Sequence, residues 1–302
     1  MRKQLCDALV ARAAKPEMVF ITGDLGFMAL EPLQEALGPR FINAGVAEQN
    51  MVSVAAGLAR QNMDVWVYSI APFCYARPFE QIRNDIAFHN LPVKLIGNGG
   101  GYGYGVMGPT HHAIGDYGVL LTLPYMSVYV PVFDEDMAAV ISCAGSSLRP
   151  AYIRMGRGEP PKGYTVPVYA PWRQLTYGGG SVVIVVGPLA GTYIEAFERM
   201  PAESRPNLWV VAELPIEQNP LPAELMTQIE KYSSLCVAEE HVRHGGFASD
   251  LLLHLADNNI AVRRFRHLYA RAHHFEKYGS QNYLRRQSRL DVDSMFVILE
   301  SH

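Results

Sequence analysis

The sequence contains few cysteines and no marked excess of charge. Its cysteines, Cys6, Cys74, Cys143 and Cys236, lie far apart and form no Cys-x-x-Cys pair. This spacing argues against a zinc site and gives no sign of a disulfide framework. Only 18% of the 302 residues are charged, and the formal net charge is -3. The composition therefore does not indicate a partner that is a nucleic acid or an anionic membrane surface.

The sequence also lacks a long apolar run near its start. Asp7 and Arg12 interrupt the N-terminal stretch, which is typical of an amphipathic helix and not of a signal peptide. With 49% apolar residues, the chain is expected to be a globular protein of the cytoplasm. The sequence Gly-Lys-Ser/Thr is absent, so no P-loop is expected.

Short apolar runs alternate with stretches of helical periodicity along the chain. Strands are expected at 18–22, 64–69, 92–97, 126–132, 151–154, 181–187, 208–213 and 234–239. Helices are expected at 4–14, 73–90, 117–123, 135–144, 189–200 and 247–258. This alternation predicts an α/β protein with two doubly wound domains and mainly parallel sheets. A proline-rich stretch suggests domains at 1–158 and 178–302, joined by a linker at 159–177.

A glycine-rich loop follows the strand expected at 92–97. Gly103, Gly105 and Gly108 fit the dinucleotide pattern G-x-G-x-x-G. A dinucleotide site needs a helix to begin at the third glycine, so that the helix N-terminus faces the pyrophosphate. Here Pro-Thr-His-His follows Gly108, and helical periodicity resumes only near Tyr117. The pattern therefore disfavours a nicotinamide site.

Residues 41–57 place one carboxylate, Glu48, where an apolar strand passes into a helix rich in small residues. Gly45 can act as the helix N-cap, which would put Glu48 at the third helical position. The apolar face of this helix is then expected to hold Val46, Met51, Val54, Ala55 and Leu58. The helix dipole alone favours an acidic residue in a first turn, so a purely structural role for Glu48 stays open.

The segment Asn-Ala-Gly-Val-Ala-Glu-Gln-Asn-Met at 43–51, followed by Ala-Ala-Gly-Leu-Ala, resembles the pyrimidine-binding domain of transketolases and 1-deoxyxylulose-5-phosphate synthases. These enzymes depend on thiamine diphosphate. The resemblance implies that Glu48 contacts N1′ of the aminopyrimidine and activates the cofactor. An apolar pocket would raise the pKa of such a carboxyl group and let it share a proton with the ring.

The same resemblance extends to other candidate site residues. Phe73 matches the phenylalanine on which the pyrimidine stacks, and Ile70 stands where a second phenylalanine is usual. Asp24 matches an aspartate close to the cofactor, although it could equally cap its own loop. His111, in Gly-Pro-Thr-His, matches a histidine beside the substrate; alternatively, it only hydrogen-bonds its own loop.

Substrate recognition is expected to involve arginines and to differ from that of ordinary transketolases. Arg2 and Arg157 match arginines that bind substrate phosphate, or they are solvated surface charges. Met107 replaces an aspartate that recognises the hydroxyl next to the acceptor aldehyde. Gly99 replaces a histidine and Met28 a serine. These departures predict a less polar or unphosphorylated acceptor.

The chain lacks the Gly-Asp-Gly motif of the family's diphosphate-binding domain. The resemblance therefore implies a second subunit that carries this domain and the Mg²⁺ ligands, in an α2β2 assembly. The C-terminal unit, with Glu239, Glu240 and His241, is expected to serve as scaffold and dimer contact. His273 and His274 are adjacent and therefore do not suggest a metal site.

These observations predict the C-terminal subunit of a split, thiamine diphosphate-dependent transketolase-like enzyme. It would transfer a two-carbon ketol unit from a ketose-like donor to an aldehyde. One alternative is the β subunit of a 2-oxoacid dehydrogenase E1 component, which passes its product to lipoamide. Another is a non-catalytic regulatory partner of a full-length enzyme.

Overall fold

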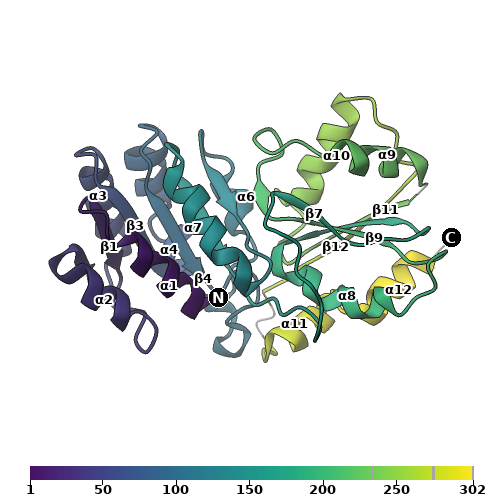
Figure 1. Cartoon of the computed structure of the whole chain (residues 1–302), viewed down its shortest axis with the longest axis horizontal. Coiled ribbons are helices and arrows are strands. Elements are labelled where there is room, and N and C mark those ends of the chain that lie inside the picture. The colour runs from purple at the N-terminus through teal and green to yellow at the C-terminus, as the bar shows by residue number, and fades with distance from the viewer. Residues whose placement is uncertain (233, 274–275, 301–302) are drawn as a thin grey trace.

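The structure is a computed structural model that describes residues 1–232, 234–273 and 276–300. Two α/β units lie side by side, with the N-terminal unit on the left in Figure 1 and the C-terminal unit on the right. The strands of the N-terminal unit are β1 (Met18–Thr22), β2 (Phe41–Asn43), β3 (Asp64–Ile70), β4 (Lys94–Asn98), β5 (Ser127–Tyr129) and β6 (Ala151–Met155). Its α-helices are α1 (Arg2–Arg12), α2 (Glu31–Leu37), α3 (Glu48–Ala59), α4 (Ala71–Tyr75), α5 (Phe79–Gln81), α6 (Asp116–Leu120) and α7 (Met137–Ser146).

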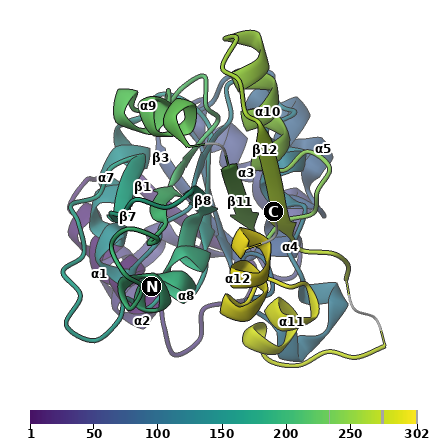
Figure 2. The same cartoon turned by 90° about the vertical axis from the view of Figure 1, so that its right-hand side faces the viewer.

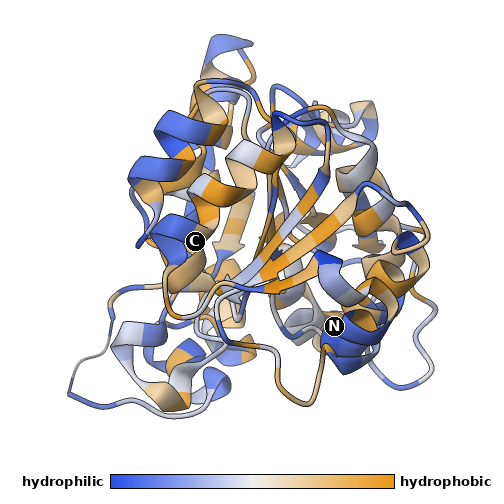
Figure 3. Ribbon diagram, turned by 90° about the vertical axis from the view of Figure 1, so that its left-hand side faces the viewer, coloured by the Kyte–Doolittle hydropathy of each residue, from blue (hydrophilic) through white to orange (hydrophobic). Residues whose placement is uncertain are grey.

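The sheet of the N-terminal unit has the order β10-β5-β6-β4-β3-β1-β2. Its strands are parallel except β10 (Glu213–Leu214), which comes from later in the chain and pairs antiparallel with β5. Helices cover both faces, so β1, β4 and β6 are buried along their whole length. Figure 3 shows the resulting pattern, with apolar strands between helices whose outer surfaces are hydrophilic.

The C-terminal unit contains a second sheet with the order β12-β11-β8-β9-β7. Its strands are β7 (Trp172–Thr176), β8 (Val182–Val186), β9 (Asn207–Val211), β11 (Ser234–Glu239) and β12 (Arg264–Tyr269). Its α-helices are α8 (Gly191–Glu198), α9 (Ala223–Lys231), α10 (Phe247–Asp257), α11 (Gln281–Gln287) and α12 (Val292–Glu300). Helices α9 and α10 lie on one side of this sheet, and α8 and α12 lie on the other (Figures 1 and 2).

The mainly parallel α/β fold is confirmed, but several local predictions need correction. Residues 172–176 fall in the predicted linker and instead form the antiparallel edge strand β7. The single helix predicted at 73–90 is broken into α4, α5 and a π-helix at Ile82–Ala87. Pro78 explains the break between α4 and α5, because proline lacks an N–H group and its ring clashes with the preceding turn.

The start of the Glu48 helix also differs from the prediction. Helix α3 begins at Glu48 with Ala47 as its N-cap, while Gly45 has a φ of 71° and lies outside the helix. Val46 and Val54 are therefore not on the buried face; their exposed fractions are 74% and 41%. The buried face is formed by Glu48 together with Met51, Val52, Ala55, Ala56 and Ala59.

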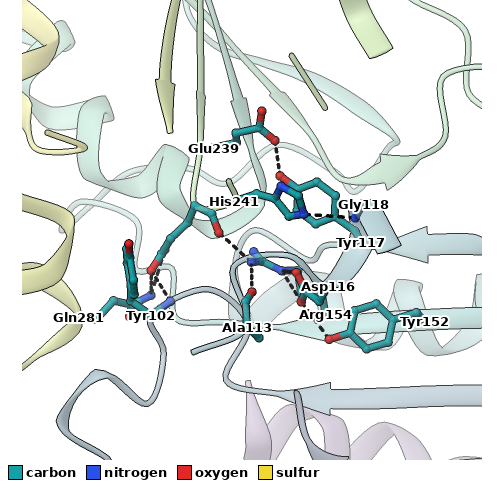
Figure 4. Close-up of polar contacts among 11 residues, drawn as sticks. Tyr102, Ala113, Asp116, Tyr117, Gly118, Tyr152, Arg154, Glu239, His241 and Gln281 are labelled. Atoms are coloured by element: carbon teal, nitrogen blue, oxygen red, sulfur yellow. Dashed lines mark hydrogen bonds and ion pairs between the residues drawn. The ribbon is translucent and has the colours of Figure 1, made fainter. Parts of the chain in front are cut away.

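A buried polar network joins the two units (Figure 4). Arg154 Nε donates to both carboxylate oxygens of Asp116, at 3.0 and 2.8 Å, and these residues are 3% and 0% exposed. Arg154 Nη2 also donates to the backbone oxygen of Glu240, at 2.9 Å. At Gly118, a Cβ would lie 2.4 Å from the carbonyl oxygen of Gly245, so the close approach of the units requires glycine there.

Within the part of the chain that the structure describes, no helix combines the length and the apolar character needed to cross a membrane.

Candidate functional site

Glu48 lies at the carboxyl end of β2, where α3 begins. The free N–H groups and the dipole of a first helical turn favour a carboxylate at this place. Its side chain is only 5% exposed, and its Oε1 accepts a hydrogen bond from Arg77 Nη1 at 2.8 Å. The pocket predicted to be apolar therefore also contains a guanidinium group.

Phe73 lies on α4, directly after β3, where the sheet edge places it beside Arg77. The guanidinium carbon of Arg77 is 3.8 Å from the centroid of the Phe73 ring, so the two planar groups are in contact. Ile70 is the last residue of β3 and is half-buried. Phe79 packs against the apolar core, as its helical spacing predicts.

His111 lies at the end of the glycine-rich loop and meets Phe73 edge to face, with ring centroids 5.1 Å apart. Thr110 Oγ1 is 3.0 Å from His111 Nδ1. Partial burial, followed by the positive charge of Arg77, lowers the pKa of His111 below its ordinary value. Glu48, Phe73 and His111 are thus brought together around Arg77.

Asp24 lies at the same edge of the sheet, in the loop after β1, and its side chain is directed to Asn43. Asn43 Nδ2 donates to Asp24 Oδ1 at 2.8 Å, and the Asp24 backbone N–H donates to Asn43 Oδ1 at 3.0 Å. A Cβ on the neighbouring Gly23 would be 3.9 Å from Glu48 Oε1. The structure therefore places the Asp24 loop next to Glu48, while the hydrogen bonds of Asp24 join it to β2.

Arg2 and Arg157 line one small cavity of about 150 Å³, together with Gly99 and Tyr104. Tyr104 fills the space that a side chain at Gly99 would need, since a Cβ there would be 2.2 Å from its ring. The Tyr104 ring also lies 6.3 Å from the His111 ring, so it separates this cavity from the Glu48 cluster. Larger cavities of about 420 and 600 Å³ lie away from Glu48, beside β12 and beside β5.

Met107 is part of the 3₁₀ turn Gly105–Met107 and is 57% exposed. The loop that carries Met107 and His111 is held by the C-terminal unit through Glu240, which is 3% exposed. Glu240 accepts from the Tyr102 backbone N–H at 2.7 Å and from Arg285 Nη2 at 2.8 Å. The scaffold contacts of the C-terminal unit therefore reach the loop that carries the candidate substrate residues (Figure 4).

Reasoning from the sequence assigned no role to Arg77, Tyr104 or Asn43. Arg77 occupies the turn before Pro78, and no periodic pattern marks a turn residue as facing a site. Tyr104 could have been noticed because Gly99, at the position of an expected histidine, leaves space for a large neighbour. Asn43 stands at the end of a strand, where parallel strands place polar side chains near a site.

No group of three or more His, Cys, Asp or Glu side chains is placed to hold a metal ion among residues 1–232, 234–273 and 276–300. Of the adjacent histidines His273 and His274, the second lies outside the described residues. The residues near Glu48 suit an organic ring better than a metal, because they offer one buried carboxylate, one aromatic face and one imidazole.

The two doubly wound units, with a buried glutamate and a phenylalanine at the carboxyl ends of parallel strands, define a class of α/β proteins that bind the pyrimidine part of thiamine diphosphate. Residues 2–162 match the family described as "Transketolase, pyrimidine binding domain". The chain belongs to the transketolase family. The resemblance seen in the sequence is therefore confirmed.

Similar proteins cover nearly the whole chain. One of the two kinds of subunit of an apulose-4-phosphate transketolase from Phocaeicola vulgatus is 30% identical over 271 residues, which are 87% of this chain and 85% of that protein. A 1-deoxy-D-xylulose-5-phosphate synthase from Nitratidesulfovibrio vulgaris is 31% identical over 265 residues. The chain covers only 40% of the length of that synthase.

Solved structures give the same result. A split gene transketolase, described as an inactive beta4 tetramer, has a TM-score of 0.82 and 26% identity, with 99% of this chain and 96% of that chain covered. A transketolase from Leishmania mexicana has a TM-score of 0.78 at 16% identity, with 44% of its chain covered, and shows the shared fold. These relatives favour a split transketolase over the β subunit of a 2-oxoacid dehydrogenase.

Proposed function

We propose that this chain is the subunit of a split transketolase that binds the pyrimidine half of thiamine diphosphate. The enzyme transfers a two-carbon ketol unit from a ketose-like donor to an aldehyde acceptor. One observation carries the proposal: a buried carboxylate, Glu48, shares one cluster with the aromatic ring of Phe73 and the imidazole of His111. The name of the Phocaeicola vulgatus relative supports the same reaction class.

The cluster fits the aminopyrimidine in chemistry and shape. Glu48 would hold the ring nitrogen with its carboxyl group, and Phe73 would provide the face on which the ring stacks. Gly23 supports the fit, because its missing side chain leaves room beside Glu48 Oε1. Asp24 and Ile70 border this position from the ends of β1 and β3. When bound, thiamine diphosphate supplies the electron sink for cleavage next to a carbonyl.

His111 is the residue that we assign to proton movement or orientation at the substrate. Its lowered pKa keeps the imidazole neutral near pH 7, so one ring nitrogen can accept a proton from a substrate hydroxyl. Arg2 and Arg157 would bind the far, anionic end of a substrate through their cavity. Met107 would present an apolar side chain where an aspartate is usual, which favours a less polar acceptor.

The site is half of an enzyme active site, and a partner subunit must complete it. This partner would carry the Gly-Asp-Gly motif, the diphosphate-binding domain and the Mg²⁺ ligands, in an α2β2 assembly. The relative described as an inactive beta4 tetramer supports this requirement, because it is a split transketolase that is inactive in that form. Activity is therefore expected only when both subunits are present.

A reconstitution experiment tests the proposal. The chain would be co-expressed with a diphosphate-binding subunit from the same genome, and two-carbon transfer from a ketose to an aldehyde would be measured. Glu48→Ala should abolish turnover while leaving assembly intact, and Glu35→Ala, on the exposed surface of α2, should leave turnover unchanged. Near-normal turnover of Glu48→Ala would contradict the proposal. Transfer to a lipoyl domain in place of an aldehyde would support the dehydrogenase alternative.

A further inference from the structure

The side chain of Arg77 makes two contacts at once with the residues that we assign to the aminopyrimidine. Its Nη1 donates to Glu48 Oε1 at 2.8 Å, and its guanidinium carbon is 3.8 Å from the centroid of the Phe73 ring. A guanidinium group is planar, stacks on aromatic faces and donates N–H bonds to carboxylates. These are the two interactions that a stacked aminopyrimidine would make with Phe73 and Glu48.

We propose that Arg77 occupies the position of the aminopyrimidine in the empty half-site and has to move away before the cofactor can bind there. This inference rests on the proposed function. Arg77 is therefore an internal competitor of the cofactor, and the strength of its contacts is subtracted from the affinity for thiamine diphosphate.

Electrostatics explain why such a group is useful before the cofactor arrives. The Glu48 side chain is 5% exposed, and a buried carboxylate without a positive partner is costly. Arg77 supplies that partner in the isolated chain. Arg77 therefore stabilises the empty half-site and weakens its affinity for the cofactor.

The position of Arg77 in the fold allows this movement. Its side chain is 45% exposed, so it can turn into solvent without the loss of a packed core. It lies in the turn between α4 and α5, and the backbone oxygen of Arg77 accepts a hydrogen bond from Gln49 Nε2 at 3.4 Å. The backbone can stay in place while the side chain changes rotamer.

Binding of thiamine diphosphate to the reconstituted complex, measured by calorimetry, tests the proposal without reference to turnover. Arg77→Ala should lower the dissociation constant about tenfold, because a partly exposed ion pair and a cation–π contact no longer compete. The same variant should lower the melting temperature of the chain without cofactor by about 2–4 °C. Arg83→Ala, an exposed arginine in the adjacent π-helix, is the matched control and should change neither value.

Chemical modification provides a second measurement that a purely electrostatic role of Arg77 would not change. Phenylglyoxal should label Arg77 faster when thiamine diphosphate is bound, as read by peptide mass spectrometry, and label Arg83 equally in both states. Weaker or unchanged cofactor binding by Arg77→Ala, or protection of Arg77 by the cofactor, would overturn the proposal. Equal cofactor affinity of wild type and Glu48→Ala would instead contradict the assignment of the pyrimidine site itself.

Discussion

The hydroxyl group of Tyr117 in the N-terminal unit donates a hydrogen bond to the carboxylate of Glu239 in the C-terminal unit. Glu239 is fully buried, and it also accepts from the backbone N–H groups of Phe247, at 2.8 Å, and Ala248, at 3.1 Å. Burial alone would raise the pKa of Glu239, but the hydrogen bond from His267 and nearby positive charge lower it overall. The two units therefore meet at an ionised, fully hydrogen-bonded carboxylate.

Removal of the Tyr117 hydroxyl should weaken the contact between the units. Tyr117→Phe is expected to lower the free energy of unfolding by about 1.5–3 kcal/mol, the usual value for a hydrogen bond to a charged group. Urea unfolding followed by circular dichroism would measure this loss. Tyr177→Phe, at a side chain that is 64% exposed, serves as control and should be neutral. A neutral Tyr117→Phe would show that the bond contributes nothing to stability.

The ion pair between Arg154 and Asp116 should be more sensitive still. Arg154→Met leaves a buried carboxylate without its cation and removes hydrogen bonds to two backbone oxygens, so a loss of about 3–5 kcal/mol is expected in the free energy of unfolding. The double variant with Asp116→Leu should recover part of that loss, because the unpaired charge is then gone. If the double variant were less stable than the single one by a further 3 kcal/mol or so, the unpaired charge would not be the cause.

The fold and the central site could be predicted because their signals are local. Alternation of apolar strands with helices predicted the mainly parallel sheets, and the motifs around Glu48, Phe73 and His111 predicted three residues that the structure brings together. Helix breaks were harder to predict. The apolar periodicity of 73–90 continues through Pro78, so the pattern alone did not reveal the turn in which Arg77 lies.

The remaining features depend on contacts between residues distant in sequence. Strand β10 crosses to the first sheet, and Glu240 reaches the glycine loop across 138 positions of the chain. No periodicity in either segment identifies its partner. The pairing of Arg77 with Glu48, over 29 positions, has the same cause. Register and side-chain direction, which only the folded chain fixes, decided each of these contacts.

The charge of Arg77 should be visible in the titration of His111. Burial and Arg77 both lower the pKa of His111, so Arg77→Ala should raise that pKa toward its ordinary value while leaving the contribution of burial. NMR titration of the histidine ring protons would measure the shift, and Arg83→Ala would be the control. An unchanged His111 pKa would mean that the guanidinium charge is screened from the imidazole.

Asp250, in the first turns of α10, should make stability depend on pH. Burial, with the charges of Glu217 and Glu239, raises the pKa of Asp250 to about 6. The folded state then binds more protons than the unfolded state between about pH 4 and pH 6, so this group lowers stability as pH rises through that window. Asp250→Asn should therefore be more stable than wild type at pH 7, by about 1–3 kcal/mol, and lose this advantage near pH 4.

A control on the same helix separates this effect from a general loss of charge. Asp257→Asn, at an exposed position, should follow the wild-type dependence of unfolding free energy on pH. The explanation fails if Asp250→Asn and Asp257→Asn behave alike between pH 4 and pH 7.

Tyr104 should affect the acceptor substrate and leave the cofactor alone. Its hydroxyl accepts a hydrogen bond from Asn98 Nδ2 at 2.7 Å, and its ring lies between His111 and the cavity lined by Arg2 and Arg157. Tyr104→Phe should raise the KM for the aldehyde about three- to tenfold, the effect of one neutral hydrogen bond, with the dissociation constant of thiamine diphosphate unchanged. Tyr125→Phe, at a side chain that is 50% exposed, is the control. A change in cofactor affinity without a change in KM would place Tyr104 at the cofactor and not at the acceptor.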